Sequence, residues 1–75
     1  MDSGESKSVN KTTYWFRLNL QNGLRVYVKS EGLNVLQGMA CAFDKAQKKG
    51  IDLDKVNKVY TVIGPRGSGE KIIIT

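Results

Sequence analysis

Two segments with alternating apolar residues, 12–20 and 24–30, are separated by Gln21-Asn22-Gly23 and constrain the fold more than any other part of the chain. Both are rich in aromatic and β-branched residues, which is typical of the two strands of a β-hairpin. Because side chains alternate between the faces of a strand, the length of the turn decides which residues share a face.

The apolar pattern distinguishes between two possible turns. A two-residue Asn22-Gly23 turn would place Leu20 opposite Arg25 and mix apolar with charged side chains. A three-residue loop, with Gly23 in the left-handed conformation, instead makes one face wholly apolar. That face holds Phe16, Leu18, Leu20, Leu24, Val26 and Val28. We predict the three-residue loop, because a shift of one residue would expose the whole apolar set.

The same register predicts an aromatic and basic surface on the opposite, open face of the hairpin. This face contains Trp15, Arg17, Asn19, Arg25, Tyr27 and Lys29, with no acidic residue between the ends of the hairpin. Aromatic rings can stack on bases while basic groups contact phosphates, and Trp, Tyr and Arg are also enriched at the centres of protein interfaces. A third interpretation is that Trp15 and Tyr27 form a cross-strand pair that only stabilises the sheet.

After the hairpin the apolar period changes to that of an α-helix. Asn34 is a predicted N-cap, and Gln37 completes a capping box, so we predict a helix over 35–49. Its apolar stripe consists of Leu36, Met39, Ala40, Phe43 and Ala46. Gly38 and Ala42 are small enough to let the helix lie close to the sheet.

Two more strands are predicted at 59–63 and 71–75, both rich in β-branched residues. The run between them, Gly64-Pro65-Arg66-Gly67-Ser68-Gly69, predicts a hairpin loop in which Arg66 is a candidate partner contact. It does not match a phosphate-binding P-loop, which needs Gly-Lys-Ser/Thr at the start of a helix. The three isoleucines at 72–74 predict that the last strand lies in mid-sheet.

These elements predict an α+β fold in the order ββαββ, with one four-stranded sheet and the helix on one face. The order resembles that of the β-grasp fold, which implies that the last strand lies parallel to the first at the centre of the sheet. We predict a single β-grasp-like domain over 12–75. The polar composition of residues 1–11 predicts a disordered N-terminal tail.

The composition argues against an enzyme. The chain has no histidine and one cysteine, so it lacks the commonest general base and any cysteine cluster for zinc. We predict no catalytic residue, no metal and no cofactor. Cys41 is interpreted as a packing or marginal surface residue, and Asp52 and Asp54 as turn or capping residues.

The charge balance predicts the class of partner. Twelve Lys and Arg against seven Asp and Glu give a net charge of +5, which attracts polyanions. We therefore predict a small nucleic-acid-binding or regulatory protein that prefers single strands or RNA to duplex DNA. The predicted contact residues are Trp15, Arg17, Arg25, Tyr27, Lys29 and Arg66.

Other interpretations of the charged and exposed groups stay open. The alternative function is a protein–protein interaction module or inhibitor that binds an acidic protein surface, or a second copy of the chain, through the same face or a sheet edge. Lys45, Lys48 and Lys49 are either an anion-binding patch or a complement to the helix dipole. The chain has no signal sequence and no long apolar run, which predicts a cytoplasmic protein without membrane contact.

Overall fold

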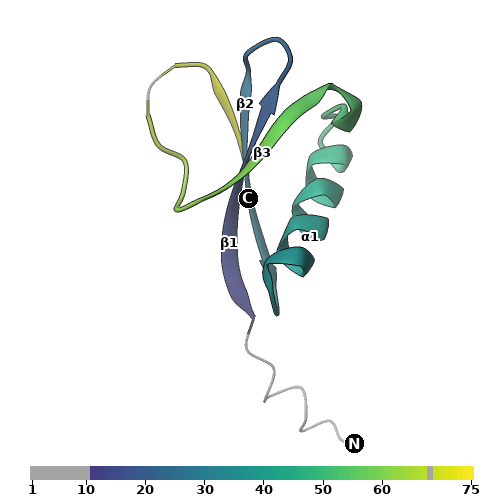
Figure 1. Cartoon of the computed structure of the whole chain (residues 1–75), viewed down its shortest axis with the longest axis vertical. Coiled ribbons are helices and arrows are strands. Elements are labelled where there is room, and N and C mark those ends of the chain that lie inside the picture. Colours follow the sequence, from purple (N-terminus) through teal and green to yellow (C-terminus); the bar gives the residue numbers. More distant parts are fainter. Residues whose placement is uncertain (1–10, 68) are drawn as a thin grey trace, which may run out of the picture.

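The computed structural model describes residues 11–67 and 69–75, which form a four-stranded mixed sheet and one α-helix. The elements are β1 (Thr12–Leu20), β2 (Arg25–Gly32), α1 (Val35–Lys48), the 3-10 turn η2 (Leu53–Lys55), β3 (Val56–Val62) and β4 (Lys71–Ile74). This confirms the predicted α+β class and the order ββαββ. In Figure 1 the helix covers one side of the sheet, and the segment joining β3 to β4 passes the other side. Apart from Lys11, the predicted tail lies outside the described residues.

The β1–β2 hairpin has the predicted register. Leu18 pairs with Val26, and the amide of Leu20 donates a hydrogen bond to the carbonyl of Leu24 at 2.9 Å. Gly23 has a φ of +90°, the left-handed conformation that a three-residue loop requires. The three-residue turn is therefore confirmed, and the apolar side chains of both strands face α1.

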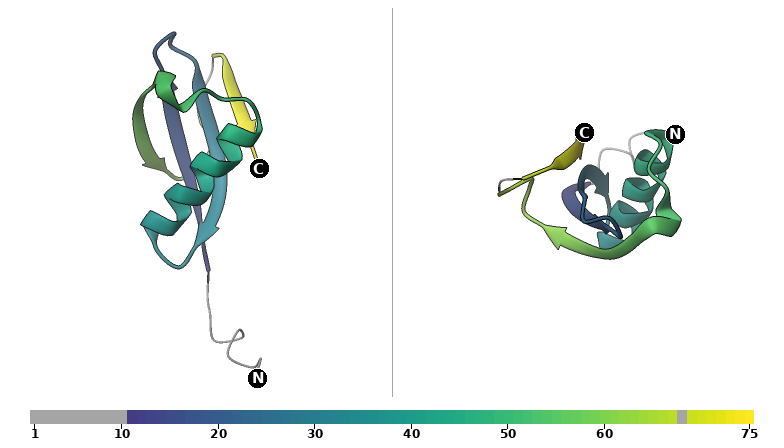
Figure 2. Two further views of the ribbon diagram at one scale, coloured as in Figure 1. Left: turned by 90° about the vertical axis from the view of Figure 1, so that its right-hand side faces the viewer. Right: turned by 90° about the horizontal axis from the view of Figure 1, so that it is seen from above.

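The strand order differs from the one that the β-grasp resemblance implies. The order is β3-β1-β2-β4, so the two strands of the hairpin lie at the centre of the sheet. β3 is antiparallel to β1, and β4 is parallel to β2. Figure 2 shows β3 and β4 at opposite edges. The prediction that they form a hairpin is wrong, and so is the central position predicted for the last strand.

The isoleucine run was misleading because such a run is also compatible with a short edge strand. In β4 only Ile74 is buried, at 3% exposure, whereas Ile72 and Ile73 are 37% and 49% exposed. β3 and β4 lie at opposite edges, and their connection crosses the face of the sheet that α1 leaves free (Figure 1). This crossing connection shapes the candidate site.

The helix starts as predicted but presents a different side to the sheet. The side chain of Asn34 accepts a hydrogen bond from the amide of Gln37 at 2.9 Å, which confirms the N-cap. The predicted stripe is partly wrong, since Leu36 is 73% exposed and Ala40 is also exposed. The buried helical residues are instead the three smallest on one side, Gly38, Ala42 and Ala46, with Met39 and Phe43 half-buried beside them.

Close contact between α1 and the sheet explains why the side with the small residues, and not the side with Leu36, faces the sheet. A Cβ atom added to Gly38 would lie 2.6 Å from Cδ2 of Tyr14, so the helix backbone touches the ring. The hydroxyl of Ser30, which is fully buried, donates to the carbonyl of Gly38 at 2.7 Å. Small residues therefore bring the helix close to the sheet, and the large side chains flank the contact.

Candidate anion-binding site

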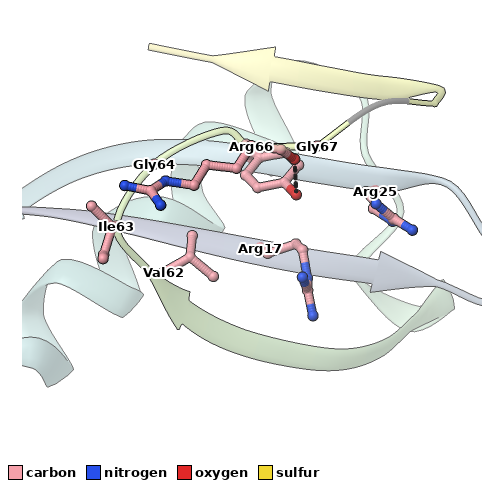
Figure 3. Close-up of a pocket in the computed structure, with 8 residues that line it drawn as sticks. Arg17, Arg25, Val62, Ile63, Gly64, Arg66 and Gly67 are labelled. Carbon is pink, nitrogen blue, oxygen red and sulfur yellow. Dashed lines mark hydrogen bonds between the residues drawn. The ribbon is translucent and has the colours of Figure 1, made fainter.

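The face of the sheet opposite α1 is partly covered, whereas the sequence predicted an open surface. Tyr27 is only 2% exposed, and its hydroxyl donates to the carbonyl oxygen of Arg66 at 3.1 Å (Figure 3). A Cβ atom on Gly64 would lie 4.0 Å from Nε1 of Trp15, whose side chain is half-buried. The expected exposure of Tyr27 is therefore wrong, because the crossing connection between β3 and β4 lies over it.

Strand pairing aligns residues from all four strands across this face. Asn19 of β1 pairs with Arg25 of β2 and with Lys58 of β3, and Arg25 pairs with Lys71 of β4. Neighbouring strands are about 4.8 Å apart, so this line of residues spans about 14 Å. We call Lys58, Asn19, Arg25 and Lys71 the cationic row.

Arg17 lies beside the cationic row, two positions before Asn19 on the same face of β1. Its guanidinium carbon is 4.5 Å from the centre of the Tyr60 ring, a cation–π contact that favours this orientation of the side chain. Nε of Arg17 and Oδ1 of Asn19 are buried without a hydrogen-bond partner among the described residues. A buried polar atom left unpaired costs about 1–3 kcal/mol, so an added ligand or a small shift that satisfies these atoms would be favourable.

A pocket of about 400 Å³ opens beside Arg17. It is lined by Arg17, Arg25, Tyr27, Val62, Ile63, Gly64, Arg66 and Gly67. In Figure 3 the Arg17 side chain extends toward β3 and the Arg25 side chain lies apart from it, while the Arg66 side chain extends the other way, toward Ile63. Within the described residues, none of these arginines pairs with a carboxylate. The ion pair found there joins Lys48 to Asp44 on α1. The pocket therefore carries uncompensated positive charge.

The structure brings together most of the residues that the sequence predicted for binding. Arg17, Arg25, Tyr27 and Arg66 line the pocket, although Tyr27 does so as a buried support. Trp15 borders the crossing connection. Lys29 pairs with Trp15 in the sheet and is exposed outside the pocket lining.

Two basic residues of this face were missed by the sequence analysis. Lys58 and Lys71 belong to β3 and β4, whose neighbours in the sheet were not predicted correctly. Alternation along β3 places Lys58 and Tyr60 on the same face, and this signal was present in the sequence. It could not be used without knowing that β3 pairs with β1. Lys71 also supports the crossing connection, because its Nζ donates to the carbonyl of Gly67 at 2.7 Å.

The other singled-out residues have local roles in the structure. The carboxylate of Asp52 accepts a hydrogen bond from the amide of Asp54 at 3.0 Å and caps η2, as predicted. Cys41 is exposed on α1. Lys45 donates to the carbonyl of Lys29 at 2.7 Å. Across the described ranges, no cluster of His, Cys, Asp or Glu is suited to hold a metal ion, and no helix is long and apolar enough to cross a membrane.

Comparison of the chain with protein-family models, with curated proteins and with solved structures gave no match. The functional assignment therefore depends on the chemistry of the pocket and of the cationic row.

Proposed function

We propose that this chain is a non-enzymatic protein that binds single-stranded nucleic acid, RNA or DNA, through the cationic row and the adjoining pocket. One observation carries the proposal. Arg17, Arg25 and Arg66 line one pocket without a paired carboxylate in the described part of the chain. Lys58 and Lys71 extend this positive surface across the sheet.

The chemistry of these side chains suits a phosphate backbone. A guanidinium presents several N–H donors in a planar fork that matches phosphate oxygens. The net charge of +5 also raises the local concentration of a polyanion around so small a protein. Neutralising phosphates releases the counterions bound to the nucleic acid, which makes affinity fall steeply with salt.

The position of α1 favours a single strand over duplex DNA. Side chains read duplex DNA most fully when a helix or a two-stranded ribbon enters the major groove. Here α1 covers one face of the sheet and the connection between β3 and β4 passes the other (Figure 1), and the cationic row shares that second face with Tyr27. Two rings border the basic surface, the half-buried Trp15 and Tyr60, which is 37% exposed. Unpaired bases can stack on such rings.

The salt dependence of binding tests this proposal. We would measure the fluorescence anisotropy of labelled single strands of about 12 nucleotides, a length within the site sizes of small single-strand-binding domains. Arg25→Ala should weaken binding and reduce the slope of log K against log salt by about 0.7, the value for one lost phosphate contact on a single strand. Trp15→Ala should weaken binding with little change in this slope, because stacking releases no counterions.

Lys49→Ala is the matched control, since it removes the same charge from an exposed residue at the end of α1. Its affinity and salt slope should stay close to those of the unmodified protein. An equal effect of Lys49→Ala and Arg25→Ala would mean that net charge alone drives binding, which contradicts a defined site. Failure to bind any oligonucleotide at low salt would refute the proposal.

An acidic protein surface is the second candidate partner for this face. The observation in its favour is that apolar groups lie among the basic ones. Ile63 is 79% exposed beside the pocket, and Ile73, on the same face of β4 as Lys71, is 49% exposed. Such groups gain more from burial in a protein interface than from a phosphate backbone. Binding to an acidic protein that persists after nuclease treatment, and that weakens less steeply with salt than binding to a single strand does, would favour this candidate.

A further inference from the structure

We infer that the pocket beside Arg17 takes a phosphomonoester, such as the terminal phosphate of a nucleic-acid strand, in preference to internal phosphodiesters. This inference rests on the proposed function and adds to it the part of the strand that the pocket recognises. Three features of the pocket support it: its size, its closed side and its charge.

The size of the pocket suits one nucleotide. Its volume of about 400 Å³ lies near the lower end of the range, about 300–1,000 Å³, of sites that enclose small ligands. A longer piece of strand would have to lie outside it. The residues Val62 and Ile63 give the pocket an apolar wall next to the arginines, which can contact the base or sugar of the seated nucleotide.

The crossing connection closes one side of the pocket. The backbone at Arg66 and Gly67 lies over Tyr27, whose hydroxyl bonds to the Arg66 carbonyl and whose side chain is 2% exposed. A strand that enters the pocket from the cationic row therefore cannot continue along β2 past Tyr27. The end of a strand meets no such obstacle, because nothing has to leave on the closed side.

The charge of the pocket favours a doubly charged group. Arg17 pairs with Tyr27 while Arg25 pairs with Asn19, so the Cα atoms of the two arginines are diagonal neighbours on adjacent strands, roughly 7–8 Å apart. Positive charges on neighbouring strands repel one another, and an anion bound between them relieves that repulsion. A phosphomonoester carries about −1.5 to −2 charges at neutral pH, whereas an internal phosphodiester carries one. Because the contact with Tyr60 already favours one orientation of Arg17, binding costs less side-chain entropy.

The test compares strands that differ only at one end. We would measure the affinity of one single-stranded sequence with a hydroxyl or a phosphate at its 5′ end, and likewise at its 3′ end. At least one terminal phosphate should tighten binding about tenfold, the equivalent of an added charge-assisted hydrogen bond. Arg17→Gln and Arg25→Gln should each bring the ratio of the two affinities, with and without the terminal phosphate, close to one. Lys49→Gln, which removes a charge at the C-cap of α1, should preserve it.

The pH dependence of the same ratio identifies the charge state of the ligand. The second ionisation of a phosphomonoester occurs near pH 6, so the ratio should fall between about pH 7.5 and about pH 5. The titratable or charged side chains that line the pocket are Arg17, Arg25, Tyr27 and Arg66, and those beside it on the same face of the sheet are Lys29, Lys58, Tyr60 and Lys71. The chain has no histidine, the side-chain type that titrates in this interval. A ratio that does not change with pH would contradict recognition of the dianion.

Competition by a nucleoside monophosphate and by inorganic phosphate separates this inference from the proposed function. If oligonucleotides bind but neither terminal phosphate changes their affinity, the phosphomonoester inference is wrong and the proposed function stands. If no oligonucleotide binds, but a nucleoside monophosphate or inorganic phosphate does and Arg17→Gln abolishes that binding, the proposed function is wrong and the pocket is a phosphomonoester site. If none of these probes binds, both are wrong.

Discussion

Replacement of Gly38 by alanine would test how closely α1 lies on the sheet. An alanine in a helix is normally favoured over glycine by about 1 kcal/mol, so helix propensity alone predicts that Gly38→Ala stabilises the protein. In the structure the added Cβ would lie 2.6 Å from Cδ2 and 3.2 Å from Cγ of Tyr14. Cγ is the point where the ring joins its stem, so the ring cannot swing clear by rotating about its own axis.

The steric cost should exceed the gain in propensity. Adding a methyl group to a closely packed site typically costs about 1–3 kcal/mol. Two ring atoms lie in the way, and any shift of α1 also strains the buried 2.7 Å hydrogen bond from Ser30 to the Gly38 carbonyl. We therefore place the steric cost in the upper part of that range, which leaves a net loss of about 1–2 kcal/mol in the free energy of unfolding.

Urea unfolding monitored by the fluorescence of Trp15, the one tryptophan of the chain, would measure this difference by linear extrapolation. Ala40→Gly at an exposed position of the same helix calibrates propensity alone and should cost about 1 kcal/mol. Tyr14→Ala should cost less in the Gly38→Ala background than in the unmodified protein, because it also relieves the clash. If Gly38→Ala stabilises the protein by about 1 kcal/mol, the close packing of α1 on Tyr14 is refuted.

Two further predictions concern the core and the crossing connection. Phe16→Ala should lower the free energy of unfolding by roughly 3–5 kcal/mol because Phe16 is fully buried. Leu36→Ala, at 73% exposure, should change the free energy of unfolding by less than about 0.5 kcal/mol. If urea unfolding showed the same loss for Leu36→Ala as for Phe16→Ala, Leu36 would have to face the sheet, which contradicts the structure. Tyr27→Phe removes the hydroxyl that bonds to the Arg66 carbonyl at 3.1 Å and should cost about 0.5–1.5 kcal/mol. Acrylamide quenching of Trp15, whose Nε1 would lie 4.0 Å from a Cβ atom on Gly64, should then increase, and unchanged quenching would show that this hydrogen bond does not hold the connection.

Local patterns in the sequence predicted the elements that depend on neighbouring residues. The hairpin register followed from the requirement that one face be wholly apolar, and Leu18 does pair with Val26. The N-cap at Asn34 and the capped turn at Asp52 are likewise short-range hydrogen-bonding patterns, and both are present. Arg17 and Arg25 were placed on one face by the same alternation.

Features that depend on distant contacts were not predictable in this way. The apolar positions of α1 formed a plausible stripe around Leu36, but the side that faces the sheet is decided by the fit between Gly38 and Tyr14. An isoleucine-rich segment contains no information about which strand it joins, so the edge position of β4 was missed. The contributions of Lys58 and Lys71 to the cationic row were missed for the same reason.

The crossing connection between β3 and β4 determines which of the predicted contact residues are able to bind. It buries Tyr27, which removes one of the rings expected to stack on bases. It also comes close to Arg25, since a Cβ on Gly67 would lie 3.8 Å from an Nη atom of that side chain, yet Arg25 itself remains exposed. Covering an aromatic ring while leaving the neighbouring guanidinium free shifts the chemistry of this face from base stacking toward phosphate contact. Removing arginines should therefore weaken nucleic-acid binding more at low salt than removing Trp15 does, because phosphate contacts gain most under those conditions.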